Sequence, residues 1–241
     1  MYLNKSVIAI VPARSGSKGI PGKNMRKLSG LTLIGHAGTC LSRLPWLDAK
    51  VISSDSPAYI EEGGRYGLDA PFVRSAELSG DTAGAVETAV HALAEAERAY
   101  GRTYDVVLLI EPTSPLREAE DVERATELLV RSQADSVVTV SALPSKFHPR
   151  KIFGLDGGKL AFYEREGAEI AYRQALDDKY WRNGVCYALT RDCLLNKRKI
   201  VTDRTLPLPI DREVVNIDEP VELEWADFLL RKRGKKEAGR R

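Results

Sequence analysis

Long hydrophobic runs are missing from this 241-residue sequence. No stretch approaches the roughly 20 apolar residues that a bilayer-spanning helix needs. The apolar segment nearest the N-terminus, Val7–Pro12, is short and leads directly into a polar loop, which is typical of a first buried strand rather than of a signal peptide. We therefore expect no association with a membrane.

Cysteine is scarce as well. The sequence contains Cys40, Cys186 and Cys193, which are widely spaced and form no CxxC pair. An odd and scattered set of this kind fits reduced thiols better than a disulfide framework or a zinc site. We expect a cytoplasmic protein.

An excess of charge of one sign is absent from the chain as a whole, whose formal net charge is +2. The exception is the C-terminal segment Arg231–Arg241, which holds seven basic residues and one acidic residue. Such a segment can contact nucleic acid, or it can be the frayed, solvated end of the last helix. We favour the second interpretation and expect a disordered tail and no nucleic-acid partner.

Two kinds of segment alternate along the chain: short apolar or β-branched runs, and longer stretches with apolar residues at helical spacing. The predicted strands are Val7–Val11, Lys50–Ser53, Asp105–Ile110, Ser136–Val140 and Gly184–Leu189. The predicted helices are Leu33–Leu44, Pro57–Tyr66, Ala83–Tyr100 with Asp81 and Thr82 as its cap, Ala119–Arg131, and one that starts near Glu219. The alternation predicts a Rossmann-like, three-layer α/β/α fold with a mostly parallel sheet.

The alternation stops after Ala142. The segment from Ser145 to Tyr180 has no long helical pattern, but it contains scattered aromatic residues and a Gly157-Gly158 turn. This pattern predicts a small β-ribbon arm, residues 144–182, and arms of this kind commonly serve as a cap or a dimer contact. The core then consists of residues 1–143 and 183–230, and the basic tail covers residues 231–241.

Three polar segments follow predicted strands: Pro12–Asn24, Glu111–Arg117 and Asn216–Glu219. Ligands of an open α/β sheet bind beyond the carboxyl ends of its strands. We therefore expect these segments to form one site.

The segment Pro12–Asn24 combines glycines with cations. Glycines let the backbone turn sharply and aim several N–H groups into one concavity, and long cationic side chains follow negative charge as it moves to a leaving group. A nucleoside triphosphate needs both. The residues are Gly16, Gly19, Gly22, Arg14, Lys18 and Lys23.

Two common phosphate-binding patterns do not match this segment. A Walker loop ending at Gly22-Lys23 requires glycine at position 17 and serine or threonine at position 24, where this chain has Ser17 and Asn24. A dinucleotide-binding GxGxxG pattern also fails, because the three glycines are evenly spaced. The remaining alternative is a flexible basic surface loop.

The run IVPARSGSKGIPGKN resembles the signature of the CMP-sialic acid synthetases (acylneuraminate cytidylyltransferases), whose relatives activate legionaminic, pseudaminic and 3-deoxy-octulosonic acids. Further matching segments follow in the family's order. They are Ser53-Ser54-Asp55, Arg74 with Asp81-Thr82, Glu111–Arg117, Arg173-Gln174, Asn183-Gly184 and Asn216-Ile217-Asp218. The resemblance implies CTP and an acidic sugar as substrates, Mg²⁺ (or Mn²⁺) as cofactor, and a cytoplasmic homodimer.

The resemblance also implies roles at the nucleotide end. Arg14, Lys18 and Lys23 are the expected catalytic residues. The expected nucleotide-binding residues are Ala13, Arg14, Gly16, Ser17, Lys18, Asn24, Arg74 and Asp81.

On the sugar side, the two prolines of Glu111–Arg117 fix the hydroxyls of Thr113 and Ser114, which suits the recognition of a sugar or a base. An alternative is that Ser114 caps the following helix. The family usually has glutamine where this chain has Glu111, close to an acceptor that is itself an acid. Because two carboxylates repel each other, we hypothesise that Glu111 marks a sugar other than plain N-acetylneuraminate.

The arm region supplies further candidates by resemblance. Arg173, followed by Gln174, matches an arginine that approaches the sugar carboxylate, with which a guanidinium pairs bidentately. The family's next arginine is replaced by Trp181, so Arg182 is a candidate beside it. Lys151 matches a lysine that reaches the partner subunit's site in relatives.

For the metal, the family presents Asp-x-Asp before its last helix, where this chain has Asn216-Ile217-Asp218. Mg²⁺ needs few protein carboxylates, because it keeps water and phosphate oxygens as ligands. We expect Asp218 to be a ligand, with Asn216 beside it and Asp211 as a weaker candidate. Asp218 alternatively serves only as a favourable charge at the start of the last helix.

These expectations define an in-line attack of the sugar's anomeric hydroxyl on the α-phosphorus of CTP, with pyrophosphate as the leaving group. No general base is evident, and deprotonation is expected near Asp218. Two other functions remain open: a nucleotidyltransferase for another sugar, such as 3-deoxy-octulosonate or a sugar 1-phosphate, and a non-catalytic nucleotide-binding module.

Overall fold

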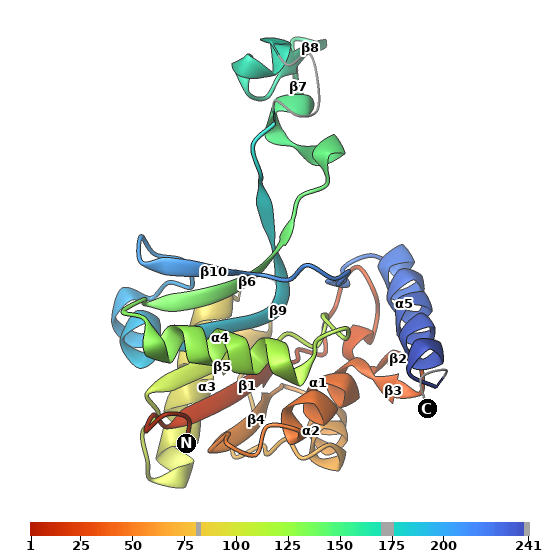
Figure 1. Ribbon diagram of the computed structural model, residues 1–241. Coiled ribbons are helices and arrows are strands. Elements are labelled where there is room, and N and C mark those ends of the chain that lie inside the picture. The colour runs from red at the N-terminus through yellow and green to blue at the C-terminus, as the bar shows by residue number, and fades with distance from the viewer. Residues whose placement is uncertain (81–82, 170–175, 239–241) are drawn as a thin grey trace.

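A six-stranded sheet forms the centre of the computed structural model, which describes residues 1–80, 83–169 and 176–238 (Figure 1). The strand order is β10-β6-β9-β5-β1-β4. Strand β9 runs antiparallel to both of its neighbours, and the other pairs are parallel, so the predicted mostly parallel sheet is confirmed. The strands are β1 (Val7–Pro12), β4 (Ala49–Ser53), β5 (Val106–Leu109), β6 (Ser136–Ala142), β9 (Tyr180–Thr190) and β10 (Thr205–Pro209).

Strand β10 is an element that the sequence did not predict. Its residues include Pro207 and Pro209, which have no backbone N–H to donate and therefore argue against a central strand. The structure places β10 at the edge of the sheet, where it pairs with β6 alone. At an edge, proline is tolerated because one side of the strand has no partner.

Helices cover both faces of the sheet, which gives the predicted three layers (Figure 1). Alternate residues of β1 point to opposite faces. Val7, Ala9 and Val11 pack in one hydrophobic cluster with α1 (Leu33–Ser42), α2 (Pro57–Arg65) and α4 (Ala119–Arg131). Ile8 and Ile10 pack in a second cluster with α3 (Ala85–Tyr100).

Capping side chains account for several helix starts. The hydroxyl of Thr32 accepts the N–H of Gly35 at 2.9 Å and caps α1. Helix α4 begins with a capping box between Glu118 and Asp121. Ser114 therefore does not cap α4, which corrects the alternative raised for its hydroxyl. The predicted caps of α3, Asp81 and Thr82, lie outside the described residues.

Strands β6 and β9 continue beyond the body of the sheet and carry the arm (Figure 1). At its far end β7 (Phe153–Asp156) and β8 (Lys159–Phe162) form an antiparallel hairpin. Gly157 and Gly158 make its turn at φ +53° and +80°, as the sequence predicts. The predicted end of the arm at residue 182 falls within β9, which is already paired with β6 from Tyr180 onward.

The last helix, α5 (Pro220–Ala238), lies beside the short strands β2 (Lys27–Leu28) and β3 (Leu31–Thr32). It extends through residues 231–238, where the sequence predicts a disordered tail. The guanidinium of Arg233 donates to the carbonyls of Leu116 at 3.0 Å and Glu213 at 3.1 Å, and these bonds attach this part of the helix to the core. None of the described helices is long and apolar enough to cross a membrane.

Candidate functional site

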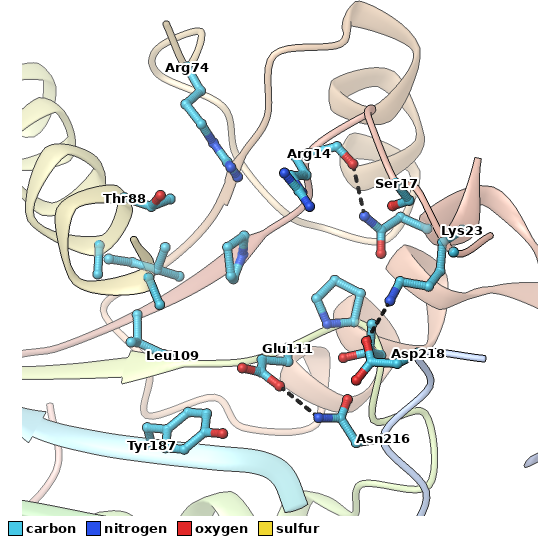
Figure 2. A pocket seen from close by; sticks show the side chains of 18 of the residues that line it. Arg14, Ser17, Lys23, Arg74, Thr88, Leu109, Glu111, Tyr187, Asn216 and Asp218 are labelled. Atoms are coloured by element: carbon cyan, nitrogen blue, oxygen red, sulfur yellow. Dashed lines mark hydrogen bonds and ion pairs between the residues drawn. The ribbon is translucent and has the colours of Figure 1, made fainter. Parts of the chain in front are cut away.

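The described residues line a cavity of about 570 Å³ at the carboxyl ends of β1 and β5 (Figure 2). It brings together most of the residues that the sequence singled out. These are Arg14, Ser17, Lys18, Lys23, Asn24, Arg74, Glu111, Thr113, Asn216 and Asp218.

Other predicted residues lie elsewhere. Ala13, Gly16, Ser114 and Arg182 do not line the cavity, although the charge of Arg182 partly offsets the rise that burial causes in the pKa of Glu111. Lys151 lies in the arm, in the 3-10 helix Pro149–Lys151 that directly precedes β7. Asp211 belongs to a separate groove, together with Trp181 and Trp225. Asp81, Arg173 and Gln174 lie outside the described residues.

The glycine-rich loop is held at both of its ends. Ser15 donates its backbone N–H and its hydroxyl to the two carboxylate oxygens of Asp55, at 2.9 and 2.6 Å. Burial of Asp55 opposes ionisation, but the hydrogen bonds from Ser15 prevail and lower its pKa. Asn24 donates its side-chain amide to the carbonyl of Arg14 at 3.2 Å and closes the loop. Asp55 and Asn24 therefore shape the loop.

The loop approaches the segment before α5 closely. A Cβ on Gly19 would lie 2.8 Å from the backbone carbonyl oxygen of Asp218, so only glycine fits there. Lys23 joins the same two segments through its ammonium group, which lies 2.7 Å from the carbonyl oxygen of Ile217 and 2.9 Å from Oδ1 of Asp218 (Figure 2). Lys23 of the loop thus forms a direct ion pair with the Asp218 carboxylate at the wall of the cavity.

Arg74 lines the other side of the cavity (Figure 2). Its guanidinium donates to the hydroxyl of Ser53 at 3.1 Å and to the carbonyl of the same residue. Burial lowers the pKa of Arg74 to about 10, against the favourable charge of Asp55. Arg74 remains a cation at neutral pH.

Glu111 follows β5 and is mostly enclosed. Burial raises the pKa of its carboxyl, and the nearby charge of Asp218 adds to this, whereas Arg117 opposes it. Oε2 of Glu111 accepts a hydrogen bond from Nδ2 of Asn216, and the two atoms are 3.4 Å apart. The other polar atom of that amide, Oδ1 of Asn216, is buried and has no hydrogen-bond partner among the described residues.

A bulge in β9 makes room for Glu111. The pairing of β6 with β9 shifts register between Val138 and Val140, and Gly184 on the opposite strand adopts φ +68°. A Cβ on Gly184 would lie 2.4 Å from Oε2 of Glu111 and 2.8 Å from the hydroxyl of Ser114. Ser114 itself donates to the carbonyl of Asn183 at 2.9 Å, so it fastens the bulge.

Several lining residues escaped the sequence analysis. Ala85, Thr88 and Ala89 come from α3, and Tyr187 comes from β9. Helical spacing places the three α3 residues on one face, but a face that lines a cavity has the same pattern as one that packs on a sheet. Burial raises the pKa of Tyr187 well above its usual range, so it is a neutral phenol in the cavity.

Comparisons with known proteins identify the family of the chain. The cytidylyltransferase family model matches residues 8–198. A CMP-N,N'-diacetyllegionaminic acid synthase of Legionella pneumophila is 31% identical, over 91% of this chain and 93% of that protein. An N-acylneuraminate cytidylyltransferase of Streptococcus agalactiae is 32% identical, over 86% of this chain and 48% of that protein. A pseudaminic acid cytidylyltransferase of Campylobacter jejuni is 28% identical, over 93% and 96%.

Among solved structures, a CMP:2-keto-3-deoxy-manno-octonic acid synthetase complexed with CTP matches with a TM-score of 0.69, covering 95% of this chain and 99% of that chain. The identity is 15%, so this likeness concerns the fold. The fold and the cavity with its basic glycine-rich loop define the class of protein, a nucleotidyltransferase. The chain belongs to the cytidylyltransferase family and is an enzyme of the acylneuraminate cytidylyltransferase type.

Proposed function

We propose that this enzyme couples CTP to an acidic 2-keto sugar of the sialic-acid type. The anomeric hydroxyl oxygen bonds to the α-phosphorus, the bond from that phosphorus to the bridging oxygen of pyrophosphate breaks, and the hydroxyl proton is released to solvent. The observation that carries the proposal is the cavity in which Lys23 of the loop lies 2.9 Å from Asp218. The names of the relatives, which act on legionaminic, N-acylneuraminic and pseudaminic acids, support the class of sugar.

We assign the triphosphate to the loop after β1. Arg14, Lys18 and Lys23 neutralise the charge that moves onto pyrophosphate as the bond breaks. The remaining nucleotide-binding assignments concern the backbone of Ala13 and Gly16, the hydroxyl of Ser17, the loop-closing Asn24 and the buried cation Arg74. The same role for Asp81 rests on resemblance.

We place the sugar between Glu111, Thr113 and the start of β9. Thr113 and Glu111 line the cavity, and Arg182 lies close enough to Glu111 for its charge to offset part of the rise that burial causes in the pKa of that carboxyl. Ser114 acts on the sugar indirectly, through the bulge that it fastens. The roles of Arg173 and Gln174 rest on resemblance.

The residues before α5 fit a magnesium ion (or manganese). Mg²⁺ prefers oxygen ligands and needs few of them from the protein. Asn216 offers a buried carbonyl oxygen with no hydrogen-bond partner among the described residues, and Asp218 offers a carboxylate whose side chain is 73% exposed. These two residues would hold the ion, which when bound supplies positive charge to the phosphate oxygens.

A homodimer is part of the proposal. The hairpin of the arm exposes Phe153, Leu155, Leu160 and Tyr163, a set of apolar side chains that a second subunit can cover. Lys151 lies just before this hairpin and does not line the cavity of its own subunit, and we assign it to the partner's site. The three buried free cysteines support a reducing compartment, the cytoplasm.

Pyrophosphate release tests the proposed function. The purified chain is incubated with CTP, Mg²⁺ and one acceptor at a time from a panel of nine-carbon 2-keto acids, 3-deoxy-octulosonate and sugar 1-phosphates, and UTP replaces CTP as the control. We expect release with CTP and a nine-carbon acid. Release with a sugar 1-phosphate alone would reassign the acceptor, and no release with any acceptor would indicate a binding module.

The panel also tests the hypothesis that Glu111 selects the sugar. Glu111→Gln is expected to change the relative rates for different nine-carbon acids, because a neutral amide repels no acceptor group and donates hydrogen bonds that a carboxylate does not. Identical relative rates in the variant and the parent enzyme would disprove the hypothesis. The Tm of both proteins checks that the variant is folded.

Gly184→Ala is expected to lower kcat/KM by about 10–100-fold, because the new Cβ displaces the carboxyl of Glu111. A positive φ costs alanine roughly 1–2 kcal/mol at any position. Gly101 provides the matched control, since its φ is +62° and no atom lies within 4 Å of the added Cβ. Gly101→Ala should lose only the stability that the positive φ costs, and it should keep its activity. Equal activity in the two variants would show that the added Cβ at position 184 does not displace the Glu111 carboxyl from a position that the reaction needs.

A further inference from the structure

Two side chains of the cavity, Glu111 and Asn216, form a directional pair. An ionised carboxylate only accepts hydrogen bonds, whereas a carboxamide has one donating and one accepting end. Nδ2 of Asn216 lies 3.4 Å from Oε2 of Glu111. The carboxylate therefore takes the donating end of the amide and leaves the accepting end, Oδ1, to point elsewhere.

Oδ1 of Asn216 faces the side of the cavity where Asp218 lies (Figure 2). Ile217, between the two, is fully buried in the hydrophobic cluster under α5, and its N–H donates to the carbonyl of Thr113 at 2.8 Å. This anchoring keeps Asn216 and Asp218 on the cavity side. A buried acceptor without a partner is rare in a folded protein and calls for a ligand.

We infer that Glu111 is a positioning residue: it orients the Asn216 carboxamide so that the oxygen, and not the NH₂ group, faces the divalent cation shared with Asp218. This inference rests on the proposed function, which places that cation between Asn216 and Asp218. Outer partners of this kind commonly orient the groups that bind a metal.

The surroundings hold the pair in this arrangement. Arg117 donates to the backbone carbonyl of Glu111 at 2.5 Å and fixes its main chain. Gly184 leaves the space that the pair occupies, since a Cβ there would lie 2.4 Å from Oε2 of Glu111 and 3.1 Å from Nδ2 of Asn216. The orientation of the amide thus depends on three segments of the chain.

Exchanging the two functional groups tests this directionality. With Glu111→Gln, the introduced amide can donate to Oδ1 of Asn216, so the Asn216 NH₂ group can turn toward the cation, which it cannot bind. With Glu111→Gln and Asn216→Asp together, the introduced amide donates to one oxygen of the introduced carboxylate and leaves the other for the cation. The double variant also keeps the net charge of the pair.

The readout is the affinity for Mn²⁺ in the presence of saturating CTP and without any sugar, measured from the electron paramagnetic resonance signal of free Mn²⁺. We expect Glu111→Gln to weaken Mn²⁺ binding about 10–100-fold, and we expect the double variant to recover most of that loss. Glu219→Gln removes a carboxylate that is exposed at the rim of the same cavity, so its smaller effect measures the loss of charge alone. Tm values check that all three variants are folded.

Three results would overturn the inference: Mn²⁺ binding by Glu111→Gln equal to that of the parent enzyme, no recovery in the double variant, or no Mn²⁺ binding by the parent enzyme. A failure of the proposed function looks different. In that case no acidic sugar releases pyrophosphate, whereas the Mn²⁺ affinities still follow the expected order, which supports the pairing.

Discussion

Lys23→Met is expected to lower kcat/KM for pyrophosphate release by about 10²–10³-fold, the usual cost of removing one preorganised charge from a site of charge development. The side chain of Lys23 is only 14% exposed, so its charge is poorly screened by water. Its ammonium also joins the glycine-rich loop to Ile217 and Asp218, at 2.7 and 2.9 Å. Methionine has a similar length and packs in the same space without the charge.

Lys27→Met is the control for this experiment, because Lys27 is an exposed lysine on β2 outside the cavity. Its activity should equal that of the parent enzyme. Lys23→Arg keeps the charge and should recover part of the lost rate. A loss below tenfold in Lys23→Met, in a protein with unchanged Tm, would show that Lys23 takes no part in neutralising the leaving group.

The local features of the site were predictable from the sequence, because their physical causes are local. A glycine-rich basic loop directly after an apolar run indicates phosphate binding. Ligands of an open α/β sheet bind beyond the carboxyl ends of its strands, which predicts that this loop lies beside Glu111 and Asp218. The cavity contains these residues together. The alternation of strands and helices likewise predicted the layers of the fold, because the hydrophobic pattern depends on near neighbours in the chain.

Contacts between distant segments were not predictable in the same way. Glu111 and Asn216 are 105 positions apart and meet through one hydrogen bond. The sequence indicated two separate departures from the family's pattern, where glutamine and aspartate are usual. In the structure the two residues form one pair, in which the carboxylate and the amide have exchanged positions relative to the family's pattern. Without an alignment of relatives, no sequence signal connects the two positions.

Arg117 is a second residue whose role depends on distant segments. It belongs to the segment Glu111–Arg117, but the sequence assigned it no function. In the structure the guanidinium is buried at 7% exposure, and burial lowers its pKa. It donates to the backbone carbonyls of Val185, of Glu111 at 2.5 Å and of Gly184 at 3.2 Å. Arg117 thus joins the end of β5 to the bulge of β9.

Arg117→Met is expected to lower the free energy of unfolding by about 2–4 kcal/mol. Each buried carbonyl that loses its donor costs roughly 1–3 kcal/mol, and this is partly offset because methionine needs no desolvation of a charge. Arg124→Met is the matched control, since Arg124 is exposed on α4 and should change stability by less than about 0.5 kcal/mol. Urea unfolding measures the free energy of unfolding of both variants, and unchanged m-values are the condition for comparing them. Equal unfolding midpoints for the two variants would mean that the cost of desolvating the Arg117 guanidinium cancels the stabilisation from its three hydrogen bonds. In that case the bulge of β9 would depend on Ser114 and Gly184 and not on Arg117.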